Sequence, residues 1–165
     1  RVDVIVLLAI IASSLRTFFM PQLGNWIVRF GVKKLLYADA FSFIFVYLCY
    51  GALSQGFNTG TLAKVGIPVV LTCALFVVDR LSSQMGIIRT IYLKSIAKDS
   101  ADVTPTLSLG MMMDHMVSIL VGITGGIAWV TFGSHYIFYA VAALSLVNLA
   151  VAILVKDPRK MEVRL

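Results

Sequence analysis

Five apolar stretches, each about twenty residues long, occupy nearly all of this chain. Crossing a hydrocarbon core of about 30 Å takes roughly 20 helical residues, because each residue adds about 1.5 Å to a helix. Hydrophobic residues make up 59% of the sequence and charged residues only 13%, about half the share typical of soluble domains. The sequence therefore predicts an all-α, polytopic membrane protein in which residues 1–165 form one transmembrane domain. The predicted spans are 4–23, 35–54, 65–88, 107–130 and 135–155.

Proline and glycine mark the expected ends of these spans, because both residues disfavour a continuing helix. Thr104 and Pro105 predict the start of the fourth span, with Thr104 as N-cap and Pro105 in the first turn. Pro21 and Gly24 are expected to close the first span, Gly51 with the polar and glycine-containing run 55–60 to close the second, and Gly133 to separate the fourth from the fifth.

Lysine and arginine gather in alternate connections between the spans. Ten of the 14 lie in the first connection, the third connection and the C-terminal tail, whereas only Arg1 and Lys64 lie on the opposite side. The positive-inside rule then predicts that those two connections and the C-terminus are cytoplasmic and that residue 1 is outside. The ten residues are Arg29, Lys33, Lys34, Arg89, Lys94, Lys98, Lys156, Arg159, Lys160 and Arg164.

The first connection carries a recognisable motif, Gly-Asn-Trp-Ile-Val-Arg-Phe-Gly-Val-Lys-Lys over residues 24–34. It resembles the short-loop signature of the major facilitator superfamily, G-x-x-x-D-R-x-G-R-[KR], except that Val28 stands at the acidic position. In such a loop the first glycine allows two helices to approach, the second turns the chain, and the cations hold the loop at the cytoplasmic face. The alternative is a basic turn that only sets topology. The matching residues are Gly24, Arg29, Gly31, Lys33 and Lys34.

The resemblance implies helices eight to twelve of a twelve-helix transporter, since the missing acidic residue is typical of the copy of the motif in the second half of that fold. The segments 79–94 and 102–115 are also similar to uncharacterised bacterial permeases of the superfamily, and this similarity implies a bacterial inner membrane as the location. The implied function is secondary active transport of an unknown small solute by alternating access, with the missing N-terminal helices as partner. The competing interpretation is a non-transporting membrane subunit or scaffold whose buried charges bind partner helices.

The third span carries two ionisable residues near its midpoint, Asp79 and Arg80. Each costs about 2.5 to 3.5 kcal/mol at the centre of a membrane helix, so we expect this span inside a bundle. Neighbouring residues lie about 100° apart around a helix and do not pair with each other. We expect Asp79, Arg80, Ser83 and Gln84 to bind the solute; the alternative is a buried ion pair that only fixes helix packing.

Small and polar residues also repeat along one face of the fourth span, which favours a cavity or a close-packed helix. A carboxylate beside an imidazole, Asp114 and His115, is suited to change protonation near neutral pH, and the two residues are predicted to couple transport to protons. Alternatively, His115 caps a backbone carbonyl while Asp114 neutralises Arg89 or Arg16. The repeating residues are Gly110, Asp114, Ser118 and Gly122.

Three charged residues near the cytoplasmic ends of their spans, Arg16, Asp39 and Arg89, predict an inner gate. The network would form when the cavity closes to the cytoplasm and break when it opens. Arg16 has an alternative role, because a cation so near the end of a span often extends to the lipid headgroups.

Other classes of function find little support in the sequence. Cys49 and Cys73 lie in apolar runs without metal-ligand spacing, and no phosphate-binding glycine loop or Ser/His/Asp arrangement is present. The net charge of +6 belongs to residues that flank apolar runs, so we expect no nucleic-acid partner. The sequence predicts neither an enzyme nor a cofactor, and its first partner is the lipid bilayer.

Overall fold

The computed structural model describes residues 2–97 and 99–155, with side chains from residue 4 onward except at residue 100. The described chain is helical and contains five helices or helix pairs long and apolar enough to cross a membrane. The predicted all-α membrane fold is therefore confirmed. The elements are α1 (Val2–Phe30), α2 (Val32–Asn58), α3 (Ile67–Ser82), η1 (Ser83–Gly86), α4 (Ile87–Ile96), η2 (Ser100–Asp102), α5 (Val103–Phe132) and α6 (Ser134–Leu154).

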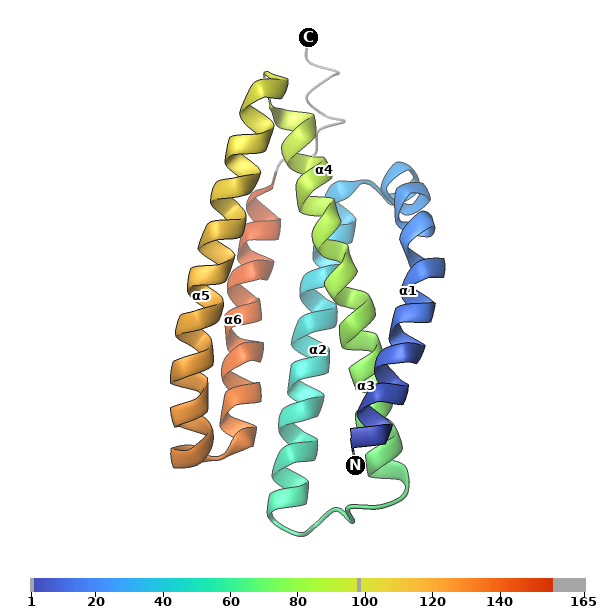
Figure 1. The fold of residues 1–165 in the computed structure, drawn as a ribbon, viewed down its shortest axis with the longest axis vertical. Helices are drawn as coiled ribbons and strands as arrows, with labels where there is room; N and C mark the ends of the chain where they lie inside the picture. The colour runs from blue at the N-terminus through green and yellow to red at the C-terminus, as the bar shows by residue number, and fades with distance from the viewer. Residues whose placement is uncertain (1, 98, 156–165) are drawn as a thin grey trace.

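The helix α2 stands at the centre of the bundle (Figure 1). It packs along α6 on one side and along α3 and α4 on the other, and α1 lies against α3. The helix α5 is at the edge and packs mainly on α6. The third span consists of α3, the short 3-10 segment η1 and α4, which follow one another along one path.

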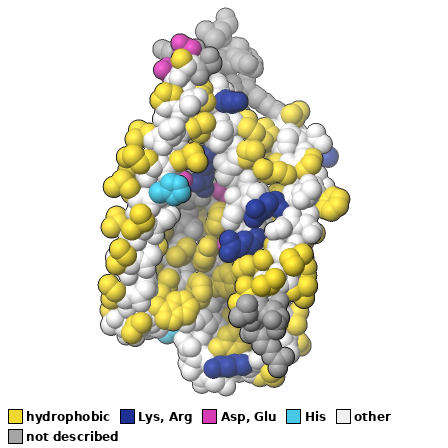
Figure 2. Space-filling view, in the orientation of Figure 1, with side chains coloured by type: hydrophobic (Ala, Val, Ile, Leu, Met, Phe, Trp, Pro, Cys, Tyr) yellow, Lys and Arg dark blue, Asp and Glu magenta, His cyan; other side chains and the backbone are white. Residues whose placement is uncertain are grey.

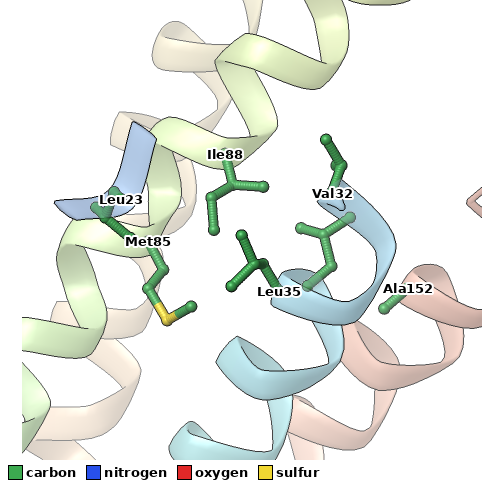
Figure 3. Packing of buried hydrophobic residues seen from close by; sticks show 7 residues of the cluster. Leu23, Val32, Leu35, Met85, Ile88 and Ala152 are labelled. Atoms are coloured by element: carbon green, nitrogen blue, oxygen red, sulfur yellow. The ribbon is translucent and has the colours of Figure 1, made fainter. Parts of the chain in front are cut away.

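A hydrophobic cluster fills the end of the bundle at which α1 turns into α2. Leu23 and Ile88 are almost fully buried in it, and Figure 3 shows these side chains pointing toward one another from α1, α2, η1, α4 and α6. Lipid tails are as apolar as these side chains, so van der Waals contact and shape hold the cluster together in a membrane. The buried members are Leu23, Val32, Leu35, Leu36, Met85, Ile88 and Ala152.

Small residues bring α2 and α6 close together. A Cβ atom at Gly51 would overlap the ring of Tyr139, so glycine is needed for this contact. The hydroxyl of Tyr139 donates to Oε1 of Gln55 over 3.0 Å, and Ser54 bonds Ser134 over 2.5 Å. The second span ends at Asn58, within the run 55–60 expected to close it, but Gly51 itself lies inside α2, because this glycine serves helix packing and not chain reversal.

The first span also runs further than its proline and glycine predicted. Pro21 and Gly24 lie inside α1, which ends only at Phe30. A proline can be accommodated within a membrane helix, and Figure 1 shows the last turns of α1 turned aside from its axis. A Cβ at Gly24 would meet no atom within 4 Å, so this glycine makes no close helix contact in the described structure.

The predicted helix starts had mixed outcomes. Gly133, with φ of 99°, separates α5 from α6 as expected, because a left-handed backbone favours glycine. Thr104 is not the N-cap: α5 begins at Val103 after Asp102, and Pro105 lies in the first turn, where its missing N–H costs nothing. The basic residues that lie outside the described residues are Arg1, Lys98, Lys156, Arg159, Lys160 and Arg164.

Candidate functional site: two polar clusters on the third span

An ion pair ties α4 to α2 near the buried hydrophobic cluster. Nη2 of Arg89 lies 3.2 Å from Oδ2 of Asp39, the single ion pair among the side chains that the structure describes. The Asp39 side chain is 2% exposed, whereas that of Arg89 is 56% exposed. Asn148 of α6 also interacts with the carboxylate, while Oδ1 of Asp39 is buried without a described hydrogen-bond partner. One acidic side chain of α2 thus interacts with two other helices, α4 and α6.

A neighbouring residue of α2 also contacts the third span, at a position before its 3-10 segment η1. Ser42 bonds Ser82, the last residue of α3, over 2.6 Å. Arg89 lies in the first turn of α4, so the two contacts to α2 flank η1. The η1 segment is therefore anchored at both ends.

A second polar cluster surrounds Asp79 on α3. Asp79 interacts with Tyr47 of α2, and its Oδ1 is buried without a described hydrogen-bond partner. Tyr47 lies between Phe43 and Tyr50, with ring centroids 6.1 Å from each. Tyr50 in turn stacks on Phe138 of α6 at 5.3 Å. The carboxylate is thus set against an aromatic face of α2.

The three other residues predicted to bind the solute are near Asp79 but contact their own helix. The guanidinium of Arg80 lies 5.0 Å from the ring centroid of Phe76, a cation–π distance. The Ser83 hydroxyl donates to the carbonyl of Asp79 over 2.9 Å, and the Gln84 amide donates to that of Arg80 over 3.5 Å. Asp79 and Arg80 form no ion pair with each other, which agrees with their angular separation on the helix.

The predicted inner gate is only partly assembled. Asp39 pairs with Arg89, but Arg16 on α1 joins neither, so the expected Arg16–Asp39 contact is not formed. Nε of Arg16 is buried without a described hydrogen-bond partner. Figure 2 shows basic side chains midway along the bundle, over α1 and α3, on a face that is otherwise largely hydrophobic.

The predicted proton-coupling residues lie on the edge helix. Asp114 and His115 are exposed on α5, and neither has a described ion pair or side-chain hydrogen bond. The alternative pairing of Asp114 with Arg89 or Arg16 is absent from the described structure. The Ser118 hydroxyl donates to the backbone carbonyl of Asp114 over 2.7 Å, so this hydroxyl already has a hydrogen-bond partner within α5. Asp114 and His115 thus form no described hydrogen bond or ion pair with either cluster.

The loop-signature residues have distinct roles at the turn between α1 and α2. Gly31, with φ of 83°, is the one residue between the two helices and makes the turn. Nζ of Lys33 donates to the carbonyl of Ile153 over 3.0 Å, in the last turn of α6, where the helix dipole favours a cation. Arg29 lies over Phe30 at 5.5 Å, and Lys34 is exposed.

The aromatic face of α2 was missed by the sequence reasoning. Phe43, Tyr47 and Tyr50 recur at intervals of four and three residues, which places them on one helix face. That spacing was a usable signal. It did not stand out because tyrosine is common in membrane proteins for reasons other than binding.

Comparisons with protein-family models, with curated proteins and with solved structures gave no match to this chain. Its function must therefore be argued from its own residues and their arrangement.

Proposed function

We propose that this chain belongs to a secondary transporter that moves a small solute by alternating access. The observation that carries the proposal is the 3-10 segment η1 in the middle of the third span, with Asp79 and Arg80 before it and Arg89 after it. Secondary transporters often place solute sites where a membrane helix is discontinuous, and a 3-10 stretch within a helix often marks a hinge.

The Asp79 cluster supplies the solute-binding groups of the proposal. Its carboxylate has an unsatisfied oxygen, and Tyr47 and Tyr50 offer flat apolar faces with hydroxyl groups at their tips. Arg80 adds a cation beside them. Such a set suits a small solute that carries polar or charged groups on an apolar body. Ser83 and Gln84 can turn from their own carbonyls toward the solute.

The pair of Asp39 and Arg89 is the inner gate in this proposal. Breaking the ion pair leaves the buried carboxylate of Asp39 uncompensated, so the closed gate resists opening until another interaction compensates. The gate lies on one side of η1, and the solute cluster lies on the other. A change at Asp79 can thus reach Arg89 through the hinge. Arg16 joins the gate only after a movement of α1.

Coupling to protons is assigned to Asp114 and His115. An ionisable side chain facing lipid at mid-span costs about 2.5 to 3.5 kcal/mol, so the exposed face of α5 needs protein or a water-filled cavity against it. Asp114→Asn should abolish uptake or efflux driven by a pH gradient while expression is preserved. Unchanged proton-driven flux in that variant would refute the coupling role.

The family proposal is the major facilitator superfamily, with these helices as eight to twelve. The five apolar helices, the one-residue turn at Gly31 and the contact of Lys33 with α6 support it. The basic turns then face the cytoplasm of a bacterial cell, and the remaining helices of the transporter cover α5.

A thermal-shift screen on the intact protein tests the solute site directly. A panel of small solutes is added to wild type, to Asp79→Asn and to Asp102→Asn, an exposed acid on η2 that serves as the matched control. We expect one solute class to stabilise wild type and the control but not Asp79→Asn. Equal stabilisation of all three proteins would place the solute elsewhere.

The exposed acidic face of α5 also favours the second candidate, a non-transporting subunit that binds partner helices through Asp114. That candidate predicts that Asp114→Asn releases a co-purifying membrane protein and that no solute of the panel shifts the melting temperature.

A further inference from the structure

A groove of about 760 Å³ lies at the end of the bundle that holds the start of α1 and the connection between α2 and α3. Its lining comes from α1, α2, that connection and α3, and it is apolar apart from Lys64, Tyr50 and Thr72. The Thr72 hydroxyl already donates to the carbonyl of Pro68 over 2.9 Å. The groove therefore offers an apolar surface with one cation, Lys64, on the connection between α2 and α3. A ligand of this groove does not require that the protein is a transporter.

The groove opens sideways, onto the surface that meets lipid. Three of its lining side chains are largely exposed: Ile5 at 61%, Val65 at 72% and Val70 at 67%. Water does not fill apolar space inside a bilayer, so apolar groups from a lipid or from another helix must occupy it. The apolar lining and the exposed side chains along it suit a flexible acyl chain.

Lys64 favours a lipid over another helix as the occupant of the groove. It makes no hydrogen bond or ion pair with any side chain that the structure describes, and it is the one lysine or arginine on the connection between α2 and α3. Gly66, with φ of 76° and open space around its Cβ position, turns this connection into α3 without covering the groove. A cation at the headgroup level beside an apolar groove matches an anionic lipid in charge and in shape.

We propose that this groove binds an anionic phospholipid, with one acyl chain along the α1–α3 surface and the phosphate against Lys64. A lysine on the side that is otherwise poor in cations then has a partner in the membrane. Bound lipid also fills the space between α1 and α3, which stabilises their contact.

The test measures lipid retention and melting temperature of the intact protein in nanodiscs of phosphatidylglycerol and of phosphatidylcholine. Wild type should retain phosphatidylglycerol through delipidation and melt at a higher temperature in it than in phosphatidylcholine. Lys64→Gln should lose most of both effects. Lys94→Gln, a change of an exposed lysine on α4, is the matched control and should keep them.

A second pair of variants tests the apolar part of the site. Val70→Trp fills the groove and should lower the retained phosphatidylglycerol several-fold, whereas Val117→Trp, on the exposed surface of α5, should not. Equal retention by Lys64→Gln and wild type would overturn the proposal. So would an equal fall in melting temperature in both lipids for Lys64→Gln or Val70→Trp, which would indicate that another helix, and not a lipid, occupies the groove.

Discussion

The carboxylate of Asp39 shows how one residue can set the arrangement of three helices. It is buried, it receives Arg89 from α4, and it interacts with Asn148 from α6. An apolar residue in its place would pack without any preference for these partners. The charge therefore specifies which helices meet at this position, a role that buried polar groups have in several folds.

The ion pair gives the first prediction. Asp39→Asn should lower the free energy of unfolding by about 1 to 3 kcal/mol, a value discounted because half of the Arg89 side chain reaches solvent or headgroups. Adding Arg89→Gln should cost less than the sum of the single changes, as measured by thermal unfolding in detergent. Strict additivity in this double-mutant cycle would show that the pair contributes no coupling.

A second prediction concerns the contact between Gly51 and Tyr139. Gly51→Ala forces the tyrosine ring to move and should destabilise the protein by about 1 to 3 kcal/mol. Gly24→Ala is the matched control, because its new methyl group meets no atom and alanine favours a helix. A control as unstable as Gly51→Ala would mean that backbone effects, and not packing, dominate.

At the scale of elements, the third span is the unit whose shape matters most. The 3-10 turns of η1 break its regular helix, while Ser42 and Asp39 of α2 hold the residues on either side. Weak internal hydrogen bonding at such a segment makes it the place where the span bends at least cost. The third span thus combines a segment that bends at low cost, η1, with neighbouring residues that are held by α2.

Gly86 allows the hinge to be tested without removing a contact. Its φ of −54° suits alanine, and a Cβ there would meet nothing within 4 Å. Gly86→Ala should extend regular helix through the segment and lower the transport rate several-fold while the melting temperature is kept or raised. An unchanged rate in liposomes would remove η1 from the mechanism, with Gly24→Ala again as the control.

How much of these elements the sequence could foretell depends on the kind of signal. Five apolar stretches predict five membrane helices, because lipid imposes length and hydrophobicity on each one separately. Helix ends were harder: Gly133 breaks the chain, whereas Gly51 and Pro21 sit within helices. The local residue is the same in a turn and in a helix contact, and only the neighbouring helix decides which one it serves.

In the candidate site, too, some features were predictable from the sequence and others were not. The positions of Asp79 and Arg80 on one span were predictable from spacing, since helix geometry fixes their faces. Their partners were not, because the approach of Tyr47 and the choice of Arg89 over Arg16 by Asp39 depend on how helices distant in sequence pack. The 3-10 segment had no clear local signal either, as Ser-Gln-Met-Gly can continue a helix.

For the whole molecule, the exposed face of α5 is the feature that most needs a partner. No residue of α5 from Thr104 to Phe132 is buried within the described bundle, and this stretch includes the ionisable Asp114. If this face lines a water-filled cavity, Ser118→Cys should react with a membrane-impermeant thiol reagent, whereas Leu120→Cys, on another face, should not. The measurement uses a background without Cys49 and Cys73. Equal protection at both positions would mean that no aqueous cavity reaches α5.

The central claim is that the Asp79 cluster binds a solute that the protein carries across the membrane. Flux of the solute found by thermal shift, measured in liposomes containing the intact protein, tests it most directly. If Asp79 binds the solute, we expect saturable flux in wild type and in Asp102→Asn, and at least a tenfold lower flux in Asp79→Asn at equal amounts of folded protein. Equal flux in Asp79→Asn and wild type, or no carried solute in wild type, would contradict it.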